Sequence, residues 1–245
     1  MADKRPALVL VHGSWHYGDL WERTARQLRR HGYRVHTPTA AGHGPGADPN
    51  ATQADAVASI ENYIVEHDLH DFAILGHSWG GTVLTQVIPK VIDRGITRAV
   101  WHNAFVVEDG NSLLDELPAA LRDALTALKD PETGLVELPL PMWRDGFIQD
   151  ASAELAAETH ALLSPEPFAM WDVALDQGPF FELVAAGSLA TSYLAFDQDA
   201  LLPWYAQFAP RLGAPRSILE PRGSHEVMFT NPRILADKIH EAVRP

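Results

Sequence analysis

The stretch Phe72-Ala73-Ile74-Leu75-Gly76-His77-Ser78-Trp79-Gly80-Gly81 decides the fold of this chain. It opens with a short apolar run that is typical of a buried strand, and the residues after it have helical spacing. Between them lies the pattern Gly-x-Ser-x-Gly, with Ser78 at its centre. A serine on such a sharp strand-to-helix turn is strained, so glycines flank it. The stretch therefore predicts a nucleophilic serine facing a helix N-terminus, the alternative being an ordinary turn with a capping serine.

The rest of the chain alternates between short apolar runs and longer segments with helical spacing. Strands are predicted at residues 7–11, 33–38, 72–75, 97–106, 191–196 and 216–219. Helices are predicted at residues 20–31, 52–66, 81–92 and 232–242. Alternating strands and helices are typical of a parallel sheet covered on both faces, so we expect an α/β fold with a mostly parallel sheet of about six strands.

The alternation stops between residues 108 and 186. This part has helical patches, repeated prolines and many aromatic side chains, but no clear strand. We interpret it as a helical cap inserted into the sheet domain. The predicted division is a core at residues 1–107, a cap at residues 108–187 and the second part of the core at residues 188–245.

Composition narrows the function. The 245 residues fit one large domain, or a core with one sizeable insertion. There is no cysteine, which excludes disulfides and a cysteine nucleophile. The formal net charge of −13 disfavours nucleic acids and anionic membranes as partners. No uncharged apolar run reaches about 18 residues, so no membrane span is expected. The residues before Ala7 lack a secretion signal, which favours the cytoplasm.

The catalytic base is expected late in the chain. A serine hydroxyl is a poor nucleophile unless a base takes its proton. His225, in Gly223-Ser224-His225-Glu226, lies just past the last predicted strand. The order nucleophile, acid, histidine puts the base there. The other late histidine, His240, falls on the last predicted helix and is interpreted as part of the scaffold.

The acid that orients the histidine should follow the strand before it. Two carboxylates lie there, in Phe196-Asp197-Gln198-Asp199. We choose Asp199, because its spacing to Pro203 suits a loop that turns into the next helix. Asp197 remains the alternative, although it can instead form a hydrogen bond within the loop.

An oxyanion hole needs two fixed N–H donors. The first is expected to be the backbone N–H of Trp79, directly after the nucleophile. The second should come from the loop after the first strand, His12-Gly13-Ser14-Trp15-His16, where we choose Ser14. Trp15 and His16 would then border the substrate. For His16, a partly buried polar residue is an equally good interpretation.

The aromatic cap predicts a mostly apolar acyl or aryl pocket. Trp143 and Trp171 are the candidate substrate contacts from this part of the chain. The same side chains can instead form the interior of the cap itself, which is the commoner role of buried aromatic residues.

Together these residues resemble the α/β-hydrolase superfamily over essentially the whole chain. Within it, the sequence is similar to the plant methylesterase and hydroxynitrile lyase group and to related bacterial esterases. The matching segments are Leu10-Val11-His12 with His16 and Trp21, the Gly76-to-Gly81 turn, His102-Asn103, and Asp197-Gln198-Asp199. The resemblance implies an α/β-hydrolase fold. It also implies that the second aspartate of the last segment, Asp199, is the acid.

Departures from the group are informative. Its hydroxynitrile lyases place a lysine after the catalytic histidine and a threonine in the first loop, where this chain has Glu226 and Gly13. Both differences disfavour a lyase. Relatives with an aspartate nucleophile are excluded by Ser78. Relatives with the acid after the fourth strand are disfavoured, because Asn103 cannot ionise.

The expected reaction is hydrolysis of a small carboxylic ester through an acyl-enzyme. It needs no metal and no organic cofactor. The partner is then a small-molecule ester or lactone rather than a nucleic acid or membrane, and the sequence allows a homodimer. Three alternatives stay open: a lactonase, a hydroxynitrile lyase-like or other cofactor-free non-hydrolytic enzyme, and a small-molecule receptor without activity.

Overall fold

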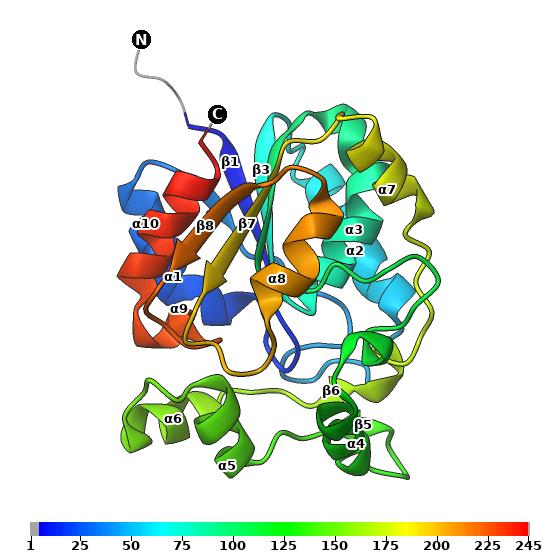
Figure 1. Ribbon diagram of the computed structural model, residues 1–245, viewed down its shortest axis with the longest axis vertical. Helices are drawn as coiled ribbons and strands as arrows, with labels where there is room; N and C mark the ends of the chain where they lie inside the picture. Colours follow the sequence, from blue (N-terminus) through cyan, green and yellow to red (C-terminus); the bar gives the residue numbers. More distant parts are fainter. Residues whose placement is uncertain (1–4, 245) are drawn as a thin grey trace.

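A six-stranded parallel sheet in the order β2-β1-β3-β4-β7-β8 forms the centre of the molecule (Figure 1). The computed structural model describes residues 5–244. The strands are β1 (Ala7–Val11), β2 (Arg34–His36), β3 (Phe72–Ser78), β4 (Ile96–Ala104), β7 (Thr191–Phe196) and β8 (Arg216–Glu220). Neighbouring strands all pair in parallel. The predicted parallel sheet of six strands is confirmed.

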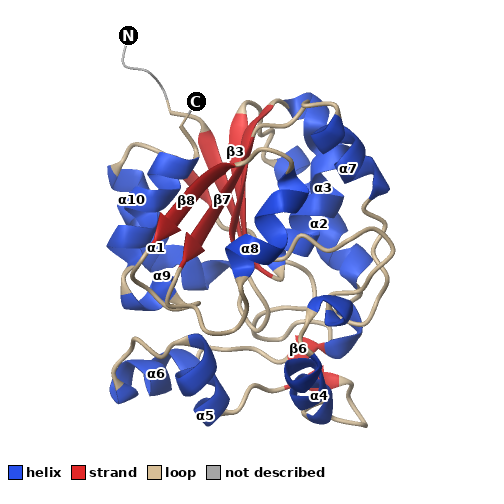
Figure 2. Ribbon diagram, viewed as in Figure 1, coloured by secondary structure: helices blue, strands red, loops and turns tan. Residues whose placement is uncertain are grey.

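Helices cover both faces of this sheet (Figure 2). They are α1 (Glu22–Arg30), α2 (Gln53–Glu66), α3 (Gly80–Val91), α7 (Gly178–Ala185), α8 (Trp204–Phe208), α9 (Val227–Thr230) and α10 (Pro232–Ala242). Helix α1 packs against α10, and α2 packs against α3. Every residue of β1 and β7 is buried as a result. Strands buried on both faces read as continuous apolar runs, which is why they were predictable.

The cap lies beyond the carboxyl ends of the strands, and the arrowheads of β7 and β8 point toward it (Figure 2). It contains α4 (Ala119–Ala127), α5 (Leu140–Met142), α6 (Ala153–His160) and a two-stranded antiparallel sheet of β5 (Leu135–Val136) and β6 (Glu166–Pro167). Helix α7 packs on α3 instead. The division into core and cap at residues 107 and 187 stays a prediction.

Several boundaries differ from the predicted ones. Strand β2 pairs over three residues, because it is the sheet edge and meets only β1. A 3-10 turn at Gly18–Trp21 precedes α1, which shortens the predicted helix. The short strands β5 and β6 contradict the expectation of a cap without strands. Two residues are too few to show a period-two pattern, and tertiary contacts decide their conformation.

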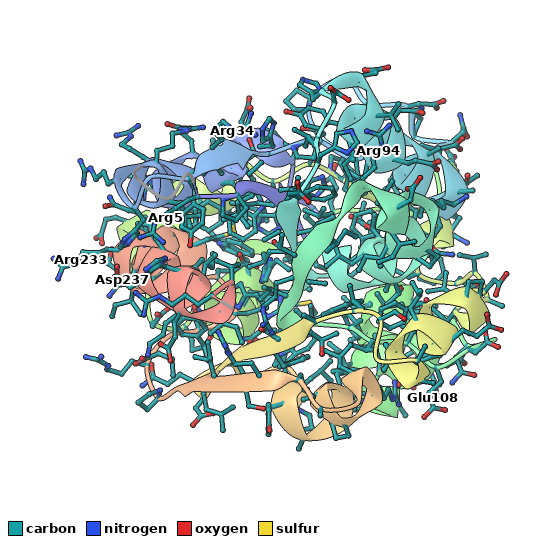
Figure 3. All side chains as sticks on the ribbon, turned by 90° about the horizontal axis from the view of Figure 1, so that it is seen from above. Arg5, Arg34, Arg94, Glu108, Arg233 and Asp237 are labelled. Atoms are coloured by element: carbon teal, nitrogen blue, oxygen red, sulfur yellow. The ribbon has the colours of Figure 1, made fainter. Side chains whose placement is uncertain are left out.

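Charged side chains lie at the rim of the molecule (Figure 3). Arg34, Glu108 and Arg233 are exposed, whereas the strands beneath them are apolar. Within residues 5–244 no helix combines the length and the hydropathy that crossing a bilayer requires. The residues before Arg5, on which part of the expectation about a leader depended, lie outside the described range.

Candidate active site

Ser78 ends β3 and precedes α3, in a backbone conformation that side chains rarely adopt. Its φ is +53°, which is strained for a non-glycine residue. The glycines on either side are required by packing. A Cβ at Gly76 would lie 2.7 Å from the carbonyl oxygen of Gly80, and one at Gly80 would lie 2.5 Å from that of His12. The turn therefore has the geometry that the Gly-x-Ser-x-Gly pattern predicts.

His225 and Asp199 form a buried pair. His225 Nδ1 lies 2.5 Å from Asp199 Oδ2, and their side chains are 1% and 0% exposed. The Asn103 amide donates to the same oxygen at 2.7 Å, and the Leu201 N–H donates to Oδ1 at 3.0 Å. Asp197 is exposed. The structure thus brings Asp199, and not Asp197, to the imidazole.

Aromatic rings enclose the His225 imidazole. Trp204 stacks on it with ring centroids 5.0 Å apart, and Phe147 meets it edge-on at 5.7 Å. Burial opposes the charged imidazole. The carboxylates of Asp199 and Glu226 outweigh burial, so the pKa of His225 lies above its usual value. Such an environment stabilises the imidazolium that a catalytic base becomes.

His77 ties the serine turn to the histidine loop. Its Nε2–H donates to the backbone carbonyl of His225 at 3.1 Å, and the two rings lie 4.6 Å apart. The hydrogen bonds of the described residues do not include one from the Ser78 hydroxyl to His225. In enzymes without substrate such bonds are often long and tighten when the substrate binds.

The loop after β1 lies directly against Ser78. A Cβ at Gly13 would come within 3.0 Å of the Ser78 Cβ. The N–H of Trp15 is already bonded to Glu166 Oε2 at 2.8 Å. The backbone N–H of Ser14 is therefore a better candidate for an oxyanion donor than that of Trp15. The assignment of Ser14 and Trp79 as the two donors stays a prediction.

One cavity opens at Ser78, with an empty volume of about 400 Å³ that includes open solvent. Among the described residues that line it, Ser14 and Ser78 are the only polar ones. The apolar ones are Trp15, Phe105, Leu113, Leu117, Leu121, Leu125, Phe147, Trp171, Leu201, Leu202 and Trp204. Trp15 and Trp171, two of the predicted substrate contacts, line this cavity, and their contact with a substrate stays a prediction. The four leucines from Leu113 to Leu125 were missed, although their spacing of four residues was a visible helical signal.

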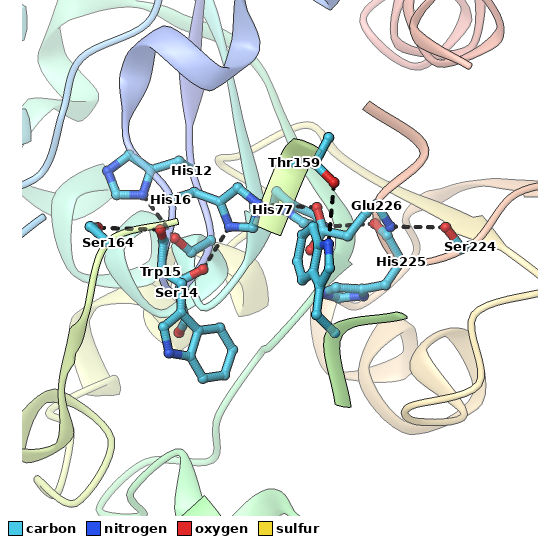
Figure 4. Close-up of polar contacts among 12 residues, drawn as sticks. His12, Ser14, Trp15, His16, His77, Thr159, Ser164, Ser224, His225 and Glu226 are labelled. Carbon is cyan, nitrogen blue, oxygen red and sulfur yellow. Dashed lines mark hydrogen bonds and ion pairs between the residues drawn. The ribbon is translucent and has the colours of Figure 1, made fainter. Parts of the chain in front are cut away.

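Two predicted substrate contacts lie elsewhere, so we correct them. The indole of Trp143 is fully buried in the cap and donates to the carbonyl of Ala156 at 3.1 Å. His16 is also buried, with Nδ1 2.6 Å from the carbonyl oxygen of Ser14 and Nε2 3.1 Å from Glu226 Oε2 (Figure 4). Neither residue lines the cavity at Ser78. Spacing along the chain could not show which way their rings turn.

Three buried groups near the site have the spacing of a cation site. His77, His225 and Glu226 offer ligand atoms within 4.8 Å of one another. Each of these three side chains contacts another protein group. His225 Nδ1 faces Asp199, Glu226 faces His16, and His77 Nε2 donates to a backbone carbonyl.

Comparison with known families places this site in context. A family model described as the alpha/beta hydrolase family matches residues 8–238. The chain belongs to the alpha/beta hydrolase family. Its turn at Ser78 and its parallel sheet are the features that this hydrolase shares with the fold.

Individual relatives agree with this assignment. A carbendazim hydrolyzing esterase from Nocardioides sp. (strain SG-4G) is 39% identical over 122 residues, which is 49% of this chain and 50% of that relative. An extracellular α/β-hydrolase from a Paenibacillus species has a TM-score of 0.91 at 33% identity, covering 98% of this chain and 100% of its own. It is described as a structural and functional homologue of tobacco salicylic acid binding protein 2.

More distant solved structures share the fold alone. A methylesterase from Arabidopsis has a TM-score of 0.76 at 19% identity, covering 98% of this chain and 99% of its own. Together with the family match and the Paenibacillus structure, it confirms the resemblance to plant methylesterases and bacterial esterases. The names of the relatives support a hydrolase enzyme for this chain.

Proposed function

We propose that this hydrolase is a serine esterase that cleaves a small, uncharged carboxylic ester. The observation that carries the proposal is the buried His225–Asp199 pair, held by His77 beside the strained Ser78 turn. A base oriented by a carboxylate is what an otherwise weak serine nucleophile needs. Relatives named as esterases support the same class of reaction.

The mechanism proceeds through an acyl-enzyme. Ser78 Oγ attacks the ester carbonyl carbon while its proton passes to His225 Nε2. The N–H groups of Ser14 and Trp79 stabilise the oxyanion. The carbon–oxygen bond to the alcohol then breaks as His225 returns the proton to the leaving oxygen. Water attacks the acyl group in the same way, which releases the acid and restores the Ser78 hydroxyl.

The cavity supports an apolar acyl or aryl group in the substrate. Its lining contains no charged side chain, and burying an unpaired carboxylate or ammonium there would cost several kcal/mol. A lactone is a cyclic ester and meets the same requirement. A cyanohydrin lyase is less well supported. Glu226 stands where the lyases have a lysine, and its carboxylate faces His16. Gly13 stands where they have a threonine, and it has no room for a larger side chain beside Ser78.

The test is a substrate panel for the wild type and Ser78→Ala. Short p-nitrophenyl esters, γ-lactones, anilides and a cyanohydrin should be compared. We expect ester turnover, and a loss of about 10³-fold or more in Ser78→Ala, because the nucleophile is removed. Ester turnover that survives this substitution would contradict the proposal. Cleavage of the cyanohydrin without ester turnover would point to the lyase instead.

A further inference from the structure

Glu166 is a fully buried carboxylate that contacts the oxyanion loop, residues 13–16. It comes from β6 in the cap, and its side chain is 0% exposed. Its Oε2 accepts the Trp15 N–H at 2.8 Å and lies 2.9 Å from His43 Nε2. A carboxylate buried in this way is costly unless it is paired and hydrogen-bonded. The contacts with His43 and Trp15 meet that condition for Oε2, whereas Oε1 is buried without a hydrogen-bond partner among the described residues.

The cap holds the remaining polar groups of Trp15 as well. The Trp15 carbonyl accepts the Ser164 N–H at 2.8 Å and the Ser164 hydroxyl at 3.2 Å (Figure 4). The indole N–H donates to the carbonyl of Val136 at 3.0 Å. Trp15 has a φ of +61°, which is strained for a residue with a large side chain. Such a conformation persists only where its surroundings enforce it.

His43 reaches the other half of the oxyanion hole. It lies in the loop after β2, and its ring is 4.6 Å from the Trp79 indole. Its Nδ1 lies 3.1 Å from the carbonyl of Ala41, while Nε2 faces Glu166. A histidine that donates from both nitrogens is protonated. Burial opposes that charge, but Glu166 outweighs it and raises the pKa of His43.

We infer that His43 and Glu166 are a positioning pair that fixes both segments of the oxyanion hole. Glu166 fixes the loop that carries Ser14 through the Trp15 N–H, and His43 packs on the residue that supplies the second donor. The inference rests on the proposed function. The inference deepens that function, because stabilisation of the transition state then requires that β6 be packed against the loop of residues 13–16. Neither residue lines the cavity, so neither contacts the substrate.

Glu166→Gln tests the pair with little change in shape. The amide has no charge to balance a doubly donating His43, so His43 loses a proton and one of its two bonds, to the Ala41 carbonyl or to residue 166, must weaken. Removing an oxyanion donor costs about 10²–10³ in kcat. We expect a displaced donor to lower kcat about tenfold or more, with KM within about twofold. Glu137→Gln is the control, because Glu137 is exposed and lies next to Val136 in the same cap.

A second variant approaches the pair from the other side. His43→Gln removes the charge and keeps a donor near Nε2. If the residues act as one unit, the double variant should be no slower than the slower single variant. Melting temperatures of all proteins show whether a loss of kcat reflects unfolding. Inactivation by a p-nitrophenyl phosphonate, which also builds up charge on oxygen, should slow by the same factor as kcat.

The outcomes separate this inference from the proposed function. A fall in kcat in folded Glu166→Gln, with KM and the Glu137→Gln control unchanged, supports it. Unchanged kcat, or a rise in KM alone, would overturn it while leaving the esterase intact, provided that Ser78→Ala is inactive. Activity that survives Ser78→Ala removes the esterase proposal and the inference together.

Discussion

Asp199 accepts hydrogen bonds on both carboxylate oxygens and its side chain is fully buried, whereas Asp197 is exposed. We therefore predict that Asp199→Asn lowers kcat/KM by about 10³–10⁴, because the amide cannot hold His225 in the required tautomer. The NH2 group of the new asparagine would also face the Asn103 NH2, which is itself a donor. Asp197→Asn should stay within about twofold of the wild type. Steady-state turnover of a p-nitrophenyl ester measures both, and the reverse ranking would assign the acid to Asp197.

The candidate catalytic residues could be predicted from the sequence, whereas the residues that hold them in place could not. Ser78, His225 and Asp199 follow strands in a fixed order, so local pattern and chain order predict their places. Asn103, by contrast, was considered as a matching residue and as a missing acid but not as a partner of Asp199, to which its amide donates. Glu166 contacts the Trp15 N–H across the cap interface. Contacts between segments distant in sequence leave no periodic signal, so these partners could not be predicted.

Helix α4 and the turn before it form a large part of the wall of the cavity at Ser78. The leucines of this segment line the cavity and also pack against the hydrophobic core. We predict that Leu125→Ala shifts the preference toward longer acyl chains, because each accommodated methylene is worth about 0.8 kcal/mol. The ratio of kcat/KM for p-nitrophenyl octanoate over acetate should rise about threefold or more.

The matched control for this prediction is Leu162→Ala, because Leu162 is 45% exposed and lies in the same cap. Its chain-length ratio should equal that of the wild type. Equal ratios in Leu125→Ala and the wild type would show that the acyl group lies elsewhere.

Buried strands were among the elements that the sequence predicted best. The runs in β1, β3 and β7 are apolar and fully or almost fully buried, so their type was evident. Strands β5 and β6 have two residues each, and α5 has three. Segments this short take their conformation from tertiary contacts rather than from their own propensity.

At the scale of the whole molecule, buried neutral histidines make the fold sensitive to acid. Burial lowers the pKa of His102 to about 3 and those of His12 and His77 well below their usual value. The unfolded chain protonates these groups near pH 6.5, so it binds more protons than the folded one. The stability that these three histidines contribute is therefore full above about pH 6.5 and falls as the pH drops below it.

Urea unfolding at pH 6 and pH 5 measures this effect. Each neutral histidine lowers the free energy of unfolding by up to about 1.4 kcal/mol per pH unit. His102→Gln should reduce this slope, whereas His70→Gln, at an exposed position, should leave it unchanged. Stability that is equal at both pH values would show that the buried rings are charged in the folded protein.

In the whole molecule, the candidate site residues lie together at one edge of the sheet. Ser78 ends β3, the loop of residues 13–16 follows β1, Asp199 follows β7 and His225 follows β8. Parallel strands bring their carboxyl ends to the same edge, which is where ligands bind in α/β sheets. The alternation of strands and helices was enough to predict this convergence. The side-chain packing of the cap around the cavity was not predictable from it.

The central claim is that Ser78 is the nucleophile, and covalent trapping tests it most directly. The protein should be treated with a p-nitrophenyl phosphonate and examined by mass spectrometry, intact and after digestion. We predict one adduct per chain, located on Ser78, formed with one equivalent of nitrophenolate and abolished in Ser78→Ala. An adduct on another residue, or full ester turnover in a protein that takes up no label, would contradict the account.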